Sequence, residues 1–134
     1  MAAILKKTIK INLTGLGKEK NLGGTEVTMT VPVEYQEGYN ITDAYDSESL
    51  QISNLASELD LTAMFGLYIK AESGTIHVLL NTAGTTAIDS TDSELTYNEG
   101  EGDYIAINPD NNAGIVINGE SATDAFSWMA VASA

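Results

Sequence analysis

Apolar and polar residues alternate one by one along much of this chain. Residues 8–13 begin the pattern, with isoleucine, isoleucine and leucine at every second position. Successive side chains of a β-strand point to opposite faces, so this stretch predicts a strand with one apolar face and one wet face. The pattern recurs over residues 27–35. Because Pro32 lacks a backbone donor, that strand should lie at a sheet edge or carry a bulge.

The remainder of the chain reads as short strands separated by turns. Residues 38–61 are the least regular, and we expect a short strand near 50–52 followed by an irregular or single-turn helical link. Residues 65–80 read as a hairpin around Glu72-Ser73-Gly74, because glycine adopts a positive φ without steric cost. Further strands are expected at 94–97, 104–108, 115–117 and 126–130, with a short additional one at 85–88.

About eight or nine short strands with regular turn signals predict an all-β fold, an antiparallel β-sandwich of jelly-roll-like form. No long amphipathic helix separates the strands, which argues against a parallel α/β sheet. We expect one sandwich domain over residues 1–134, in which residues 1–7 either belong to the sandwich or form an extended arm. The predicted core consists of Ile9, Ile11, Val27, Met29, Val31, Leu67, Ile69, Ile76, Val78, Leu80, Ile105, Ile107, Ile115, Ile117, Phe126 and Trp128.

Composition narrows the possible functions. The chain has 134 residues, no cysteine and a formal net charge of -13. The absence of cysteine excludes disulfides and thiolate metal sites, and it fits folding in a reducing cytoplasm. The acidic charge repels phosphate backbones, so no nucleic-acid partner is expected. The longest apolar stretches, such as residues 63–69, are far shorter than a membrane span, so no membrane partner is expected.

The few basic residues are unevenly placed. The chain has no arginine, Lys70 stands alone, and every other lysine lies between Lys6 and Lys20. Lysines on a first strand can protect a sheet edge from unwanted pairing. They can also direct that strand onto an acidic partner, including another copy of the chain. Under the second interpretation the contact residues are Lys6, Lys7 and Lys10.

No catalytic site, metal or cofactor is predicted. His77 is the single histidine, and it alternates with Ile76 and Val78, so it should point away from their face. One histidine cannot build a typical zinc site. Ser73 and Glu72 are near it in sequence, but no nucleophile-elbow pattern surrounds them. We expect a surface or interface histidine on a strand.

Two ligand-binding alternatives stay open. Acidic turns could bind calcium through oxygen ligands, although turn residues also bond their own backbone. These turns contain Asp43, Asp46 and Glu48; Glu99, Glu101 and Asp103; and Asn108, Asp110, Asn111 and Asn112. Aromatic residues could stack on sugars, but only Tyr39 and Tyr45 fall in an expected loop, and most aromatics should fill the core or pair across strands.

The second half of the chain resembles a known class of proteins. The resemblance is carried by Gly66-Leu67-Tyr68-Ile69-Lys70, Thr75-Ile76-His77-Val78-Leu79-Leu80-Asn81, Asp103-Tyr104-Ile105-Ala106-Ile107, Gly114-Ile115-Val116-Ile117-Asn118 and residues 126–131. In this layout of strands and turns the chain resembles small β-sandwich virion proteins of tailed bacteriophages. Such proteins are implied to decorate capsids or to belong to tails, collars or fibres, and no catalytic residues come with the resemblance.

We therefore expect a non-enzymatic structural component of a phage particle, made in the host cytoplasm and located in the virion. Its expected partners are other virion proteins and copies of itself, as a homo-oligomer. A carbohydrate-binding β-sandwich module is the alternative, and it would need a coplanar row of exposed aromatic residues. A hydrolase would need a carboxylate pair at suitable separation in a groove.

Overall fold

The computed structural model describes residues 4–15, 17, 19–29, 34–45, 47–82, 84, 87–108 and 114–133. The chain forms two compact units, Met1–Val33 and Glu34–Ala134. Strands account for 56% of the structure and helices for 6%, which confirms the expected all-β class. Among the described residues, no helix is long and apolar enough to cross a membrane.

The first unit is an antiparallel hairpin of β1 (Leu5–Leu13) and β2 (Lys20–Met29), which forms a two-stranded sheet of its own. Residues 5–7, considered above as part of an arm, lie within β1. Of the strand expected over 27–35, the described residues 27–29 lie at the end of β2 and residues 34–35 lie at the start of the next strand. Pro32 falls between them, outside the described residues.

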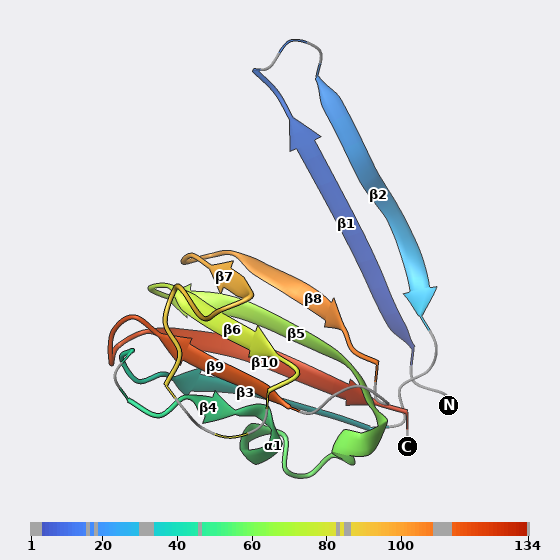
Figure 1. The fold of residues 1–134 in the computed structure, drawn as a ribbon. Helices are drawn as coiled ribbons and strands as arrows, with labels where there is room; N and C mark the ends of the chain where they lie inside the picture. The colour runs from blue at the N-terminus through green and yellow to red at the C-terminus, as the bar shows by residue number, and fades with distance from the viewer. Residues whose placement is uncertain are drawn as a thin grey trace. The chain divides into compact units, whose positions relative to one another are not determined.

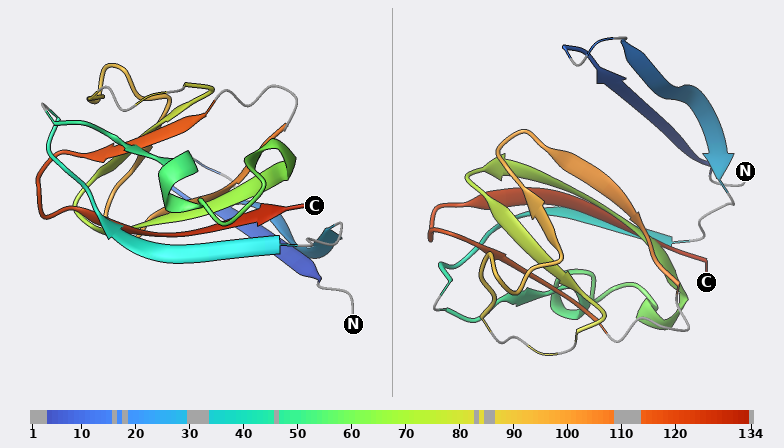
Figure 2. Two further views of the ribbon diagram at one scale, coloured as in Figure 1. Left: turned by 90° about the horizontal axis from the view of Figure 1, so that it is seen from below. Right: turned by 45° about the horizontal axis from the view of Figure 1, so that its top comes forward.

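The second unit is a sandwich of two four-stranded sheets, seen as two layers in Figures 1 and 2. The strands of the sandwich are β3 (Glu34–Ile41), β4 (Leu50–Gln51), β5 (Met64–Ser73), β6 (Ile76–Leu80), β7 (Leu95–Tyr97), β8 (Gly102–Ala106), β9 (Ile115–Gly119) and β10 (Ala125–Ala132). One sheet has the strand order β3-β10-β5-β8 and is called the β10 sheet, and the other has the order β4-β9-β6-β7 and is called the β9 sheet. A helical turn α1 (Ile52–Leu55) and a 3-10 turn η1 (Leu61–Ala63) lie between β4 and β5.

The strand pairing of the sandwich is nested. Its first described strand pairs with its last (β3 with β10), and β4, β5 and β6 pair with β9, β8 and β7 in turn. Every one of these pairs is antiparallel, and the pairs are shared between two sheets. This is the connectivity of a jelly roll, so the expected fold is confirmed.

Two local predictions have different outcomes. The strand and single helical turn expected after residue 50 are present as β4 and α1. The hairpin expected over residues 65–80 is wrong, because β5 belongs to the β10 sheet and β6 to the β9 sheet. The turn at Gly74, with φ +69°, carries the chain from one layer to the other. A glycine turn predicts that the chain reverses, but it does not determine which strand becomes the neighbour.

The core lies between the two sheets. Nine of the predicted core residues are buried there: Leu67, Ile69, Ile76, Val78, Ile105, Ile115, Ile117, Phe126 and Trp128. Leu80 and Ile107 are partly buried against this cluster. The prediction is wrong for Ile9, Ile11 and Val27, which are 48%, 55% and 53% exposed on the hairpin. Alternation identifies an apolar face, but it does not say what covers that face. The side chains of Met29 and Val31 lie outside the described part.

Candidate functional site

The three lysines expected to contact a partner all lie on β1. Nζ of Lys6 is 3.4 Å from Oε1 of Glu26 on the neighbouring strand, and both side chains are more than half exposed. Lys7 lies opposite Val27 and Lys10 opposite Gly23. Exposed ion pairs of this kind stabilise by roughly 0–1 kcal/mol, so Lys6 remains available to a stronger partner.

The hairpin also exposes large apolar side chains. Ile11 and Leu22 stand directly opposite each other across the two strands, and they are 55% and 63% exposed. Ile9 and Ile11 share one face of β1, because side chains two apart on a strand point the same way. A two-stranded hairpin is marginally stable in water without a further layer. This apolar surface is therefore the part of the hairpin that would gain most from a partner.

A bulge gives the hairpin its register. The pairing shifts between Thr8 and Lys10, so β2 carries one more residue than β1 there. Gly23 pairs with Lys10 directly beside this bulge and has a φ of +79°, and an added Cβ would collide with the carbonyl oxygen of Ile9. Glycine is required at this position for both its conformation and its size.

Charge divides between the two units. Five of the six lysines lie in residues 1–33, whereas all but two of the 19 carboxylates lie in residues 34–134. The hairpin unit is thus basic and the sandwich strongly acidic. Such a distribution favours contact between unlike units of neighbouring molecules and disfavours contact between like units.

A separate polar cluster surrounds His77 on the outer side of the β9 sheet. We expected a surface or interface histidine on a strand: His77 does lie on β6, but a surface position is wrong, since the residue is 1% exposed. Its Nε2 lies 2.7 Å from the Tyr45 hydroxyl and 3.1 Å from Oε1 of Glu120. Its Nδ1 lies 3.1 Å from the Thr96 hydroxyl and 3.2 Å from that of Ser93. Both ring nitrogens are therefore satisfied, as burial requires.

The cluster joins segments that are distant in the sequence. Thr96 stands opposite His77 in the β6–β7 pair, while Glu120 directly follows β9 and Tyr45 lies between β3 and β4. The Tyr45 hydroxyl donates to the Glu120 carboxylate, and its ring tilts against the imidazole at a centroid distance of 5.3 Å. With the Tyr45 proton directed at Glu120, the His77 ring can donate from Nε2 and accept at Nδ1. One side chain thus fastens three segments to the sheet.

Titration in this cluster follows from the same contacts. Burial, and next the hydrogen bond to Glu120, raise the pKa of Tyr45 to about 12. Hydrogen bonds from Tyr45 and then from His77 lower the pKa of Glu120. Near neutral pH the carboxylate is therefore charged and the phenol is neutral, which is the pairing that the hydrogen bonds need.

Ser93, His77 and Glu120 together have the residue types of a hydrolytic triad. Catalysis would also need a cavity beside the serine and donors for a developing oxyanion. Here Thr96 shares Nδ1 with Ser93, and the two hydroxyls lie 3.3 Å apart. Each hydrogen-bond partner of His77 belongs to a strand or loop, and the bond to His77 holds that segment in place. We therefore assign the cluster a fastening role.

Three tyrosines are exposed on the outer face of the β10 sheet. Tyr35 and Tyr39, on β3, are 65% and 60% exposed, and Tyr68 on β5 is 37% exposed. Tyr39 was expected in a loop and instead lies on a strand. The register aligns Glu37, Met129 and Tyr68 across three strands, so all three tyrosines share one face. Beside Tyr68 lies an open depression of about 700 Å³, lined by Glu37, Gly38, Tyr68, Ser127, Trp128 and Met129.

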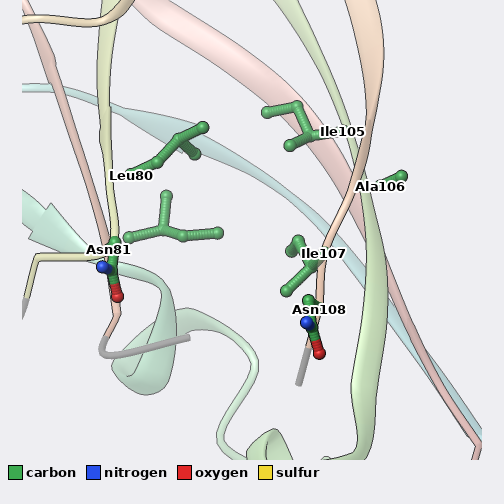
Figure 3. Close-up of a pocket in the computed structure, with 7 residues that line it drawn as sticks. Leu80, Asn81, Ile105, Ala106, Ile107 and Asn108 are labelled. Atoms are coloured by element: carbon green, nitrogen blue, oxygen red, sulfur yellow. The ribbon is translucent and has the colours of Figure 1, made fainter. Parts of the chain in front are cut away.

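A smaller pocket lies between β6 and β8. Figure 3 shows Leu80, Ile105 and Ile107 turned toward it, with Asn81 and Asn108 beside them. Its volume is about 140 Å³, below the range of about 300–1,000 Å³ that is typical of small-molecule sites. Its lining is mostly aliphatic, so we assign it no ligand.

The acidic turns use their carboxylates locally. Oε2 of Glu101 accepts from the backbone nitrogen of Asn98 at 3.1 Å, and Oδ1 of Asp103 accepts from that of Tyr104 at 2.8 Å. Within the described ranges, no group of three histidine or acidic side chains is arranged to hold a metal ion. Asp46 and residues 110–112 of the other two turns lie outside those ranges.

Sequence reasoning singled out the lysines of β1, whose contact with a partner stays a prediction, and it missed most of the His77 cluster. The alternation of Ile76 and Val78 correctly placed His77 on the opposite face. Ser93 and Glu120 lie 16 and 43 residues away and carry no local signal. The exposed tyrosines could have been found, because Tyr35, Glu37 and Tyr39 stand at alternate positions.

Comparison with known proteins adds no relative. No protein-family model matches this chain. No curated protein and no solved structure matches it either.

Proposed function

We propose that this protein is a non-enzymatic structural component of a viral particle, from a tailed bacteriophage, that acts by binding other virion proteins and copies of itself. The observation that carries the proposal is the hairpin β1–β2, with Ile9, Ile11, Leu22 and Val27 about half exposed or more. Exposed apolar surface of this kind marks interaction sites. Burying it against a partner would supply affinity, and the lysines of β1 would tune approach and register.

The fold and composition support the same proposal. Jelly rolls build viral capsid proteins, among other classes, so the fold alone does not decide the function. The resemblance of residues 65–133 to phage virion proteins points in the same direction. The net charge of -13 favours contact with proteins rather than with packaged nucleic acid. On this proposal the protein is made in the host cytoplasm and resides in the virion.

Assembly can be tested with a matched pair of double variants. Ile11→Ser/Leu22→Ser removes one apolar cross-strand pair, and Asn12→Ser/Asn21→Ser changes the adjacent polar pair. Sedimentation velocity over a range of concentrations should show an oligomer for the parent and the asparagine variant, and a weaker one for the isoleucine variant. Electron micrographs of particles labelled against the chain should show it in place. A parent that stays monomeric at high concentration and labels no particle would overturn the proposal.

A second candidate is binding of neutral glycans on the tyrosine face of the β10 sheet. Tyr35, Tyr39 and Tyr68 form the exposed aromatic set that this function needs, and Glu37 and Ser127 offer hydrogen-bonding groups among them. Strand geometry spaces Tyr35 and Tyr39 by roughly 14 Å, so a ligand would have to be an oligosaccharide. The acidic surface disfavours anionic glycans.

A screen of neutral oligosaccharides tests this candidate. Tyr39→Ala should lose any binding that the parent shows, whereas Tyr45→Phe, in the His77 cluster, should retain it. Absence of binding to the parent at millimolar glycan would remove the candidate and leave the assembly proposal intact.

A further inference from the structure

Strand β3 is the longest edge strand of the sandwich. It has eight residues, and among the residues that the structure describes its only strand neighbour is β10. The other edge strands, β4, β7 and β8, have two, three and five residues. An edge strand presents backbone N–H and C=O groups on its outer side, and a long one is a template for pairing.

The side chains of β3 hold it in a fixed extended form. The amide of Gln36 donates to the carbonyl of Leu55 and accepts from the backbone nitrogen of Glu58, both at 3.0 Å. Asn40 accepts from the indole nitrogen of Trp128 at 2.7 Å. The alternate residues Tyr35, Tyr39 and Ile41 are exposed at 60% or more. The strand is therefore ordered before any partner arrives, which lowers the entropic cost of pairing.

The hairpin offers the complementary strand. β1 has nine residues, against eight in β3, and in the described part of the chain it pairs with β2 alone, which leaves its other edge for a further strand. It contains Lys6, Lys7 and Lys10 and no acidic residue, whereas β3 contains Glu34 and Glu37 and no basic residue. Unlike charges on facing strands attract, and two hairpins placed together would bring their lysines into repulsion.

We propose that β1 of one copy adds to the edge of β3 of a second copy and extends the second copy's β10 sheet from four strands to six. This inference rests on the proposed assembly function and names its partner and surface. Backbone hydrogen bonds between the strands would provide affinity, as in other cases of strand addition. Ile9 and Ile11 would be buried beside apolar side chains such as Tyr39 and Ile41. Lys7 would then lie on the face of Glu37, and Lys6 and Lys10 on the face of Glu34.

Charge reversal tests the pairing. Lys6→Glu/Lys10→Glu makes β1 acidic, and Glu34→Lys/Glu37→Lys makes β3 basic. Each double variant should weaken self-association at low salt about tenfold, which corresponds to about 1.4 kcal/mol. The β3 variant is decisive, because it reduces the net negative charge of the protein. If general repulsion between acidic molecules were the only effect, this variant would associate more strongly than the parent. The chain with all four changes keeps the parent's net charge of -13 and should recover association.

Hydrogen–deuterium exchange on the parent provides a measurement that needs no variant. Amides of residues 34–41 and of β1 should exchange more slowly at assembling concentrations than at dilution. As a control, Glu94→Lys/Glu99→Lys makes the same charge change beside the short strand β7 and should leave association as strong as in the parent, or slightly stronger.

Three results distinguish the inference from the proposed function. Weakening by both double variants, recovery in the fourfold variant and protection of β3 would support strand addition. If Ile11→Ser/Leu22→Ser abolishes assembly, but β3 stays unprotected and the charge variants assemble like the parent, strand addition is overturned and assembly through the hairpin stands. A parent that is monomeric under all conditions overturns both.

Discussion

His77 and Glu120 stand 43 residues apart in the sequence, yet Nε2 of the imidazole lies 3.1 Å from Oε1 of the carboxylate. The register explains the contact, because His77 lies opposite Asn118 in the β6–β9 pair and Glu120 follows two residues later. Through this contact a buried side chain in the middle of a sheet holds the turn between β9 and β10.

Replacing His77 should destabilise the sandwich. His77→Ala leaves a cavity and removes hydrogen bonds to four side chains, and we expect a loss of about 2–3 kcal/mol in the free energy of unfolding. Urea unfolding followed by circular dichroism measures it. Glu99→Gln, in an exposed turn, serves as the control and should change stability by less than about 0.5 kcal/mol. Equal midpoints for both variants would contradict the fastening role.

Glu120 should contribute to stability above acidic pH. Its pKa in the fold is lowered from the ordinary 4.5, so the folded state releases its proton more readily than the unfolded chain. The contribution is present above pH 4.5 and is lost as the pH falls through the lower, folded-state pKa. The free energy of unfolding of Glu120→Gln, measured from pH 7 to 3, should therefore approach that of the parent at the acid end. A constant difference across the range would rule out this linkage.

Two tyrosines with raised pKa values, Tyr45 and Tyr97, should make the fold sensitive to alkali. The pKa values of Tyr45 and Tyr97 are raised from 10.0 to about 12, with burial as the first cause in both. Folded molecules thus hold these protons more tightly, and their stabilising effect is complete below pH 10 and is lost as the pH rises toward 12. Tyr45→Phe should flatten the fall in unfolding free energy over this window, whereas Tyr35→Phe, at an exposed position, should not. Identical alkaline profiles for the two variants would count against the assignment.

Replacing Gly23 should destabilise the hairpin and leave the stability of the sandwich unchanged. Gly23→Ala forces a Cβ against the carbonyl of Ile9 at a φ of +79°, so β1 and β2 should exchange their amide hydrogens faster. Gly15→Ala provides the matched control, because its φ of +89° carries the conformational strain but nothing lies within 4 Å of its Cβ. The melting temperature of the sandwich should be the same in both variants. A lowered sandwich melting temperature in Gly23→Ala would show that the two units are coupled.

Much of the sandwich could be predicted from local pattern. Alternation at Leu67 and Ile69, or at Ile76 and Val78, reports one buried face directly, and those residues form the core. The same pattern misled at Ile9 and Ile11, since a strand whose apolar face is exposed has the same alternation as a strand in a core. Periodicity reports that a face is apolar, but burial depends on what packs against it.

The connections and the His77 cluster could not be predicted in the same way. Gly74 marks a reversal of the chain, but whether the next strand pairs in the same sheet or crosses to the other depends on strands much later in the sequence. The contacts of Tyr45 and Glu120 with His77 depend on that same long-range pairing. The exposed row of Tyr35 and Tyr39 is local, and alternation would have been sufficient to find it if residues 34–41 had been predicted as a strand.

The nested strand order has a consequence for synthesis on the ribosome. Glu34 pairs with Ala132, so β3 cannot join its neighbour until almost the whole sandwich has been translated. The hairpin needs only residues 5–29 and can form early, because its contacts are local. A nascent chain would thus carry a finished, apolar hairpin while the first strand of its sandwich still lacks a partner. Neighbouring chains on one polysome would then be exposed to premature strand addition, which the attraction between the lysines of β1 and the glutamates of β3 would favour.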